Sequence, residues 1–390
     1  MNKNLWLLAA AQGLFLTNNV TFIAINGLVG LALAPVGWMA TLPVMGYVLG
    51  GALSTQPVAY TQMRFGRKVS FQMGLGVAVL SALLCAWAAF DRHFGLLCLA
   101  TVVAGYYNAN AQLYRFAAAE LAGTTGQEKA VSLVMAGGLL GAVAGPNLAA
   151  STRNLIATPF AGAYLALAGV ALLSMVILSA IHFPPPPTKK ALAGGRPLSV
   201  IMRQPIFIVA AACSALGYGV MNLLMAATPI AMQQCGLPFS ATALVLEWHV
   251  IGMFAPSFFT GHLIKRFGPL PVMAVGVVLN LLCIVVALSG VELHQFLTGL
   301  FLLGIGWNFL FTGATTLSLQ AYAPEEKDRA QGALNFCVFA TLALSSFASG
   351  LLVTTQGWTL LNYGSLVPLA LTAAALLWLM QRQRLSARPI

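Results

Sequence analysis

Charged residues are scarce in this sequence, making up 7% of its 390 residues, and only eight of them are Asp or Glu. So few charges do not suit a soluble chain, because 59% of the residues are hydrophobic and the mean hydropathy is +0.87. The apolar runs also lack the acidic or histidine clusters that membrane-embedded enzymes use for metal and phosphate. The composition therefore predicts an integral membrane protein that is not an enzyme.

The six cysteines lack the CxxC or paired spacing of a zinc or disulfide framework, and the first apolar run lacks a signal-peptide cleavage site. About 20 apolar residues in a helix cross a bilayer, and runs this long and continuous favour helices over a barrel. The sequence predicts twelve spans, near residues 5–32, 35–60, 69–90, 94–119, 129–152, 158–183, 204–232, 238–264, 270–290, 294–322, 329–353 and 357–380.

The net charge of +11 follows the predicted topology and does not indicate nucleic-acid binding. Only Arg92 and Arg153 fall on one side of the predicted membrane, and Arg115 lies within the fourth span. The positive-inside rule then places both termini and the central loop in the cytoplasm, and we expect a multi-pass protein of the bacterial inner membrane. The other 16 of the 19 basic residues lie on the cytoplasmic side: Lys3, Arg64, Arg67, Lys68, Lys129, Lys189, Lys190, Arg196, Arg203, Lys265, Arg266, Lys327, Arg329, Arg382, Arg384 and Arg388.

A proline-, glycine- and lysine-rich stretch beginning at His182, "HFPPPPTKKALAGGRPLSVIMRQP", interrupts the apolar runs. It predicts a cytoplasmic linker over 184–203 between six-helix bundles at 1–183 and 204–390. An internal repeat supports the division, because "QMRFGRKVSFQMGLGV" and "LIKRFGPLPVMAVGV" align with Gly66 and Gly268 in register.

Two parallel six-helix repeats with "RFGRK" after the second span resemble the major facilitator superfamily. The resemblance implies an all-α fold of twelve transmembrane helices in two pseudo-symmetric halves. Met63 and Lys265 stand where the two loop copies carry an acidic residue in that family, which leaves its cytoplasmic salt bridge unsupported by these loops. In the fifth span, "GGLLGAVAGP" resembles the family's glycine-proline motif, which marks antiport in many members, although such small residues also simply allow close helix packing.

Ionisable residues within apolar spans are rare and are functional candidates. Arg115 and Glu120, near the cytoplasmic surface, are expected to make a structural or gating contact with a neighbouring helix. Glu247 lies deeper and could carry a coupling proton. At 100° per residue it points about 200° away from His249, so it does not share that residue's face.

His249 and three methionines form two pairs, each with the four-residue spacing of one helix face. His249 and Met253 are four residues apart on one span, and Met221 and Met225 are four apart on the span before it. If the two helices pack antiparallel across the turn "CGLPFS", Met225 lies level with His249 and Met221 with Met253. Three thioethers and an imidazole are soft ligands that favour Cu(I). The alternative is that methionine fills the core and histidine bonds a neighbouring helix.

The pair "MNLLM" and "HVIGM" resembles the MxxxM and HxxxM motifs of the CcoA-like (CalT) bacterial copper importers, which supply haem-copper cytochrome oxidase assembly. The resemblance implies that copper ion is the transported substrate, with no prosthetic group, and that Met221, Met225, His249 and Met253 are its ligands. It also implies a thiol relay. Cys213, Cys235 and Cys337 are the candidates for that relay, and buried inert cysteine is the alternative.

The sequence thus predicts a monomeric copper importer working by alternating access in the lipid bilayer, with cytoplasmic copper chaperones as downstream partners. The nearest alternative is a proton-coupled exporter of small amphipathic organic molecules. A non-transporting copper sensor or assembly partner is a third interpretation, but it leaves twelve spans in two repeats without a purpose.

Overall fold

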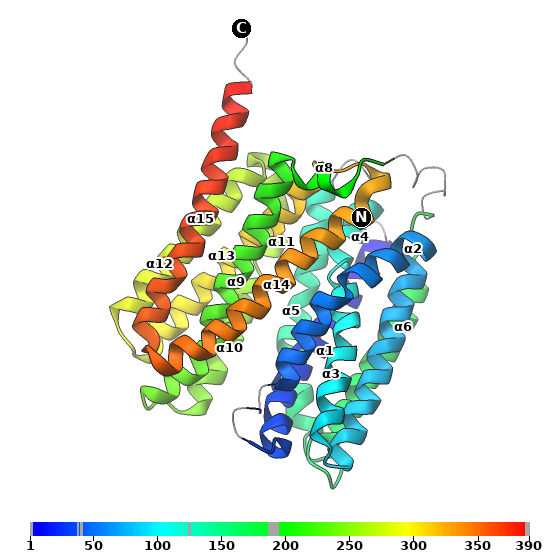
Figure 1. The fold of residues 1–390 in the computed structure, drawn as a ribbon, viewed down its shortest axis with the longest axis vertical. Helices are drawn as coiled ribbons and strands as arrows, with labels where there is room; N and C mark the ends of the chain where they lie inside the picture. The colour runs from blue at the N-terminus through cyan, green and yellow to red at the C-terminus, as the bar shows by residue number, and fades with distance from the viewer. Residues whose placement is uncertain (1–2, 37–38, 40–41, 124–125, 186–194, 387–390) are drawn as a thin grey trace. The chain divides into compact units, whose positions relative to one another are not determined.

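In the described residues, 3–36, 39, 42–123, 126–185 and 195–386 of a computed structural model, every regular element is a helix (Figure 1). In chain order these are α1 (Lys3–Leu33), α2 (Leu42–Phe90), α3 (Phe94–Ala111), α4 (Tyr114–Ala122), α5 (Gln127–Thr152), α6 (Ala161–Ser179), α8 (Leu198–Met202), α9 (Pro205–Gln234), α10 (Phe239–Phe254), α11 (Ser257–Phe267), α12 (Pro269–Ser289), α13 (Leu293–Ser318), a 3₁₀ turn (Pro324–Glu326), α14 (Lys327–Thr355) and α15 (Gly357–Ser386).

Nine of the helical segments in the described ranges are long and apolar enough to cross a membrane. The predicted spans exceed this number because helices merge or break. The second and third spans form α2, which kinks at Gly66, and two other spans are divided into α3 with α4 and α10 with α11. The predicted all-α polytopic fold is therefore correct, and the differences concern where one helix ends and the next begins.

The predicted repeat has a structural counterpart at its two glycines. Gly66 has φ 78° and ψ 174°, and Gly268 has φ 83° and ψ 164°. This conformation is open almost only to glycine, because a Cβ atom would clash with the backbone. Two positions 202 residues apart in the sequence therefore adopt the same turn between consecutive spans.

The chain forms two compact units. Unit 1 comprises 1–125, 133–194 and 327–339, and unit 2 comprises 126–132, 195–326 and 340–390. The predicted bundle boundaries, 1–183 and 204–390, remain a prediction, and two short segments join the unit of the other half. In the predicted linker, 186–194 lie outside the described residues and Leu198–Met202 form α8.

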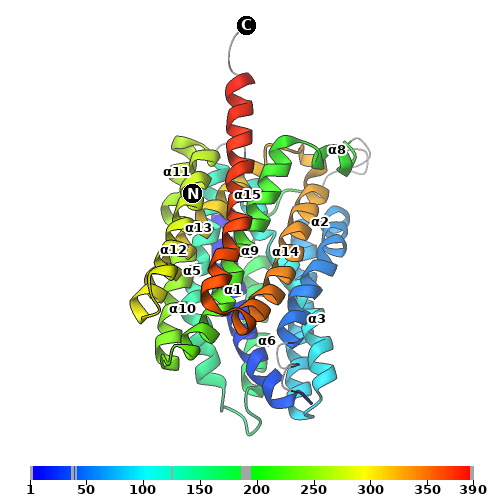
Figure 2. The same cartoon turned by 60° about the vertical axis from the view of Figure 1, so that its left-hand side comes forward.

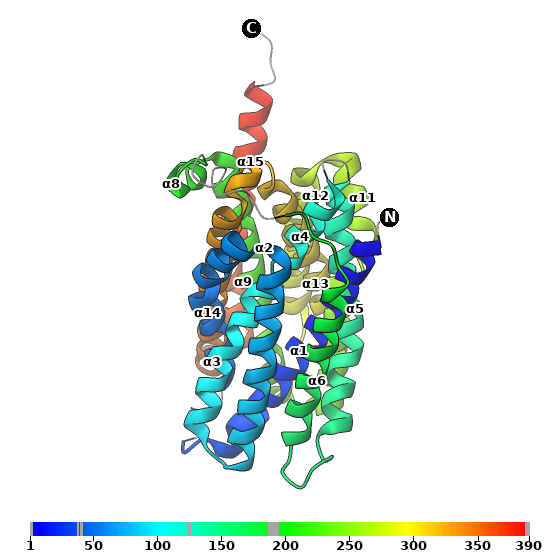
Figure 3. The ribbon, with the colours of Figure 1, turned by 90° about the vertical axis from the view of Figure 1, so that its right-hand side faces the viewer.

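In unit 1, α2 packs along α3 and α6, and α6 also packs along α1 (Figure 3). A buried cluster joins these four helices and includes Phe22, Tyr47, Leu97 and Tyr164. Gly50 and Gly105 allow the closest approach, because a Cβ on either would collide with the backbone of the facing helix. Small residues bring α2 and α3 together, as is typical of helix packing in membranes.

The glycines of "GGLLGAVAGP" allow α5 to pack closely against α1. A Cβ at Gly137 would collide with the carbonyl oxygen of Ala9, and one at Gly141 would lie 2.5 Å from the Cβ of Leu16. Both contacts are with α1. The packing interpretation of this motif is therefore confirmed.

In unit 2, α13 is the central helix and packs against α9, α10 and α12, while α15 covers α9 and α12 (Figure 2). The core between them contains Cys213, Met273, Leu310 and Leu376. In contrast, α10 packs chiefly on α13 and only marginally on α9. Consecutive helices in this unit are therefore not necessarily packing partners.

Candidate functional site

A stripe of half-buried side chains runs along α9. Tyr218, Asn222 and Met225 are spaced i, i+4 and i+7, so they share one face of the helix, while neighbouring positions are mostly buried. The Asn222 amide donates to the hydroxyl oxygens of Ser345 and Ser346 on α14, at 2.9 Å each. This face of unit 2 therefore offers neutral hydroxyl, amide and thioether groups.

An aromatic cluster lies behind Tyr218. Its ring contacts Trp307 and Phe311 edge to face, with 5.2 Å between centroids in both cases. Trp307 stacks on Phe311 at 4.9 Å and also contacts Phe254. The Trp307 indole is 2% exposed, and its Nε1 has no hydrogen-bond partner among the described residues. An unpaired buried donor costs about 1–3 kcal/mol, so an acceptor that reached this N–H would be favoured.

Unit 1 carries neutral polar groups at corresponding helices. Asn19 on α1 is half-buried and donates from Nδ2 to the Tyr47 hydroxyl on α2 at 2.9 Å. Tyr106 is half-buried on α3, and its hydroxyl lies 3.1 Å from Thr61 Oγ1. Amide and phenol groups of this kind recognise uncharged polar ligands through hydrogen bonds and aromatic contact.

Arg115, the basic residue predicted within a span, is buried and donates hydrogen bonds to two side-chain amides. Its guanidinium donates to Asn335 Oδ1 at 2.8 Å and to Gln112 Oε1 at 3.5 Å. Glu120 has different partners, so the two predicted residues each contact a neighbouring helix but do not form a pair.

Glu120 belongs to a cluster of charged side chains. The loop sequences alone gave no support for such a cytoplasmic salt bridge. Glu120 accepts from Arg67 at 2.5 Å and from Lys327 at 2.7 Å, and Arg67 lies 3.4 Å from Asp328. Burial alone would raise the pKa of Glu120, but the Arg67 and Lys327 charges together lower it below its usual value. The acid that the Gly66 loop lacks at Met63 is supplied to Arg67 by Glu120 of α4 and by Asp328 at the start of α14, all within unit 1.

The four predicted copper ligands lie in apolar packing regions of unit 2. Met221, His249 and Met253 are 2%, 0% and 6% exposed, and Met225 is half-buried. His249 Nδ1 lies 2.7 Å from the carbonyl oxygen of Leu300 on α13. Because a carbonyl only accepts, Nδ1 carries the proton. The backbone of Met253 is likewise bonded to α13, through Asn308.

The predicted level pairing of the two motifs assumed that α9 and α10 pack together. They are consecutive and antiparallel, yet α10 lies along α13, where Gly304 approaches the backbone between His249 and Met253. The prediction that Met225 lies level with His249, and Met221 with Met253, therefore does not establish contact between the two pairs of residues.

The remaining predicted residues are dispersed. Cys213 is buried in the core among α9, α12, α13 and α15, and Cys235 is exposed at the end of α9. Cys337 is half-buried on α14, in the part that belongs to unit 1. Glu247 is exposed on α10, beside Trp248, which is 44% exposed.

Sequence analysis missed Tyr218, Asn222 and Trp307. The spacing of Tyr218, Asn222 and Met225 was a usable signal, because a polar residue repeated along one face of an apolar span is unusual. Trp307 gave no such signal, since its unpaired N–H follows from what surrounds it.

Comparison with known proteins identifies relatives over the whole chain. The Major Facilitator Superfamily profile matches residues 5–255 and 210–390. The chain is 39% identical, over 93% of its length and 92% of the relative, to the riboflavin transporter RfnT of Brucella anthropi. It is 26% identical to the uncharacterised transporter YddS of Bacillus subtilis, over 88% of this chain and 83% of that one. The solved structure of the transporter FucP in the outward conformation is similar in fold, with TM-score 0.76, 14% identity and coverage of 97% and 98%.

The copper-import prediction is wrong, because a relative this similar over almost the whole chain is a riboflavin transporter and not a copper importer. The resemblance to the CcoA-like branch, and the role in cytochrome oxidase assembly that it implied, lose their support with it. Methionines four residues apart are common wherever apolar helices pack, which is why the spacing misled. The predicted alternative, transport of small organic molecules, agrees better with this relative.

Proposed function

Because the chain belongs to the major facilitator superfamily and is a transporter rather than an enzyme, we propose that it carries riboflavin or a closely similar neutral flavin across the membrane. The observation that supports this most is the 39% identity to a riboflavin transporter over 93% of the chain. The proposed setting is the bacterial inner membrane, with a monomer working by alternating access.

The chemistry of the described residues supports an uncharged aromatic substrate. Riboflavin joins a flat three-ring system bearing carbonyl groups to a chain of hydroxyls, and it has no charge at neutral pH. The half-buried Tyr218 ring, backed by the buried rings of Trp307 and Phe311, suits aromatic contact with the flavin ring system. Asn222, Ser345 and Ser346 supply donors and acceptors for the hydroxyl chain.

A counterflow assay tests this function without any assumption about direction or energy source. Proteoliposomes containing the full chain are loaded with unlabelled riboflavin and diluted into a trace of labelled riboflavin. We expect transient accumulation of label that depends on both the protein and the internal substrate. Lumichrome, ribitol and flavin mononucleotide as internal substrates then show whether the ring, the chain or neutrality is recognised. The absence of exchange with riboflavin and with each of these compounds would overturn the proposal.

Tyr218→Leu tests the aromatic contribution. Loss of one aromatic contact with the ring is expected to raise the KM for riboflavin exchange roughly two- to tenfold. Tyr363→Leu is the matched control, because Tyr363 lies on α15 and is 52% exposed. An equal effect of both substitutions would exclude Tyr218 from the binding surface.

Coupling to protons is proposed to use Glu247. It is the one Asp or Glu of the sequence in the interior of a predicted span, and it is exposed on α10. In Glu247→Gln, we expect riboflavin movement driven by an imposed pH gradient to be lost while counterflow persists, since exchange moves no net proton. Gradient-driven transport equal to that of the unmodified protein would exclude this role.

A further inference from the structure

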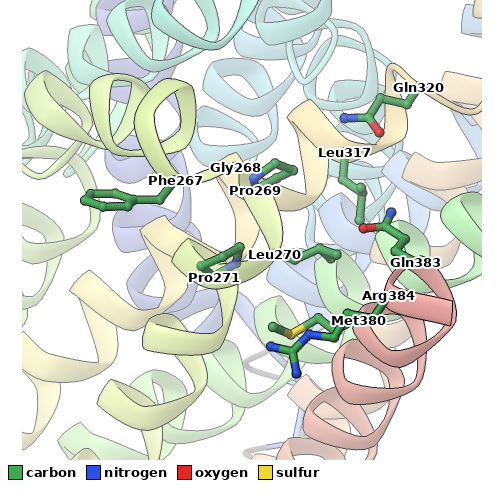
Figure 4. A pocket seen from close by; sticks show the side chains of 10 residues that line it. All are labelled: Phe267, Gly268, Pro269, Leu270, Pro271, Leu317, Gln320, Met380, Gln383 and Arg384. Atoms are coloured by element: carbon green, nitrogen blue, oxygen red, sulfur yellow. The ribbon is translucent and has the colours of Figure 1, made fainter. Parts of the chain in front are cut away.

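A cavity of about 430 Å³ opens at one end of unit 2, where four helices meet. Its walls come from the junction of α11 and α12, from the end of α13 and from the last turns of α15 (Figure 4). The ten residues that line it are Phe267, Gly268, Pro269, Leu270, Pro271, Leu317, Gln320, Met380, Gln383 and Arg384.

The depth of this cavity places it at a bilayer surface. The 21 residues of α12, Pro269 to Ser289, rise about 32 Å, which matches the hydrocarbon thickness of roughly 30 Å. The first residue of α12, Pro269, therefore lies where hydrocarbon meets headgroups. Beyond this level α15 continues past the ends of α12 and α13 (Figure 2), and Arg384 belongs to its last turn.

The lining combines an apolar floor with a basic, amide-bearing rim. Leu270, Leu317 and Met380 supply apolar surface, while Arg384, Gln320 and Gln383 supply hydrogen-bond donors. The ten residues include no Asp or Glu. Lys265 and Arg266, in the last turn of α11, add positive charge directly before Phe267. The charge of the site is therefore complementary to an anion.

We propose that this cavity binds the headgroup of an anionic phospholipid, with the phosphate on Arg384 and the glycerol and first acyl carbons on the apolar floor. A free phosphate ion would gain nothing from Leu270, Leu317 and Met380, whereas a lipid meets both surfaces at once. Basic pockets between transmembrane helices at the cytoplasmic side recognise lipids in this way. The positive-inside expectation for the same loops places the cavity in the leaflet that carries anionic lipid.

Native mass spectrometry of the purified full chain tests the proposal, with equal amounts of phosphatidylglycerol and phosphatidylcholine in the detergent. We expect phosphatidylglycerol adducts to exceed phosphatidylcholine adducts, and Arg384→Gln to weaken phosphatidylglycerol binding about fivefold. Arg382→Gln is the matched control, because Arg382 lies two residues away, over the Trp378 ring at 5.7 Å. It is expected to retain the preference.

A second variant distinguishes loss of the site from misfolding of the protein. Met380→Glu places a carboxylate in the cavity and is expected to abolish the phosphatidylglycerol preference while phosphatidylcholine adducts persist. Equal binding of the two lipids by the unmodified protein would overturn the proposal. Equal losses of phosphatidylglycerol binding in Arg382→Gln and Arg384→Gln would overturn the proposal, because the preference would then follow from net charge alone. Displacement of the lipid by inorganic phosphate would assign the site to the free ion.

Discussion

At the residue scale, Arg67 is a buried charged side chain with several partners in the described part of the chain. Its side chain is 3% exposed and contacts Glu120, Asp328, Gln62 and Gln331. A guanidinium with planar, forked donors suits several acceptors at once, whereas a single ammonium would satisfy fewer. Removing one acid from such a site leaves a buried cation with fewer partners, which is the costly way to break an ion pair.

Glu120→Gln is therefore expected to destabilise the protein by about 3 kcal/mol. Thermal unfolding in detergent measures the effect. Glu325→Gln is the control, because Glu325 is half-buried but forms no ion pair among the described residues, and it should leave the melting temperature nearly unchanged. Similar melting temperatures for both variants would show that the cluster contributes no net stability.

The Glu326 carboxylate predicts a pH dependence. Hydrogen bonds from Arg196, at 2.7 and 2.8 Å, lower the pKa of Glu326 from 4.5 to about 2. A pKa that is lower in the folded state stabilises the protein above the unfolded value, and this contribution is lost as the pH falls from about 4.5 to about 2. Melting temperatures of the unmodified protein and Glu326→Gln should converge over that range. Curves that stay parallel would exclude the linkage.

At the element scale, close helix approach depends on individual glycines rather than on glycine content. Gly50 faces the backbone of Val102 on α3, with the Val102 carbonyl carbon 2.8 Å from the position of an added Cβ. Gly76 lies on the same helix and has no atom within 4 Å of that position. The two glycines therefore have opposite expectations for the same substitution.

Gly50→Ala is expected to destabilise the protein by about 1–3 kcal/mol through overpacking. Gly76→Ala is expected to stabilise it by roughly 0.5–1 kcal/mol, because alanine loses less conformational freedom in a helix. Melting temperatures of the two variants give the signs directly. A stabilising Gly50→Ala would mean that α2 and α3 do not approach this closely.

At the scale of the whole molecule, the basic loops predict the orientation in the membrane. A green fluorescent protein fused after the last residue of α15 should be fluorescent, because it folds in the cytoplasm. Alkaline phosphatase inserted beside Arg92 or Arg153 should be active, and the same insertion in 184–203 should not. The opposite activities at these positions would reverse the assigned topology.

The sequence by itself determined the class of protein and most of its fold. Continuous apolar runs, a basic linker and paired glycine loops suffice for twelve helices in two halves, because lipid leaves helices as the simplest way to satisfy the backbone. Gly66 and Gly268 were recognisable in advance as aligned positions of the repeat, and both adopt a conformation that is specific to glycine.

Only the tertiary structure decided which side chains meet. Spacing along a helix fixes a face, but not the helix that covers it, so Met221 and His249 suggested a joint site although α10 lies on α13. Likewise, two partners of Arg67 come from positions 53 and 264 residues away, and the Trp307 N–H has no hydrogen-bond partner among the described residues, although three aromatic rings contact the indole. Contacts between distant residues depend on packing geometry, which no local pattern encodes.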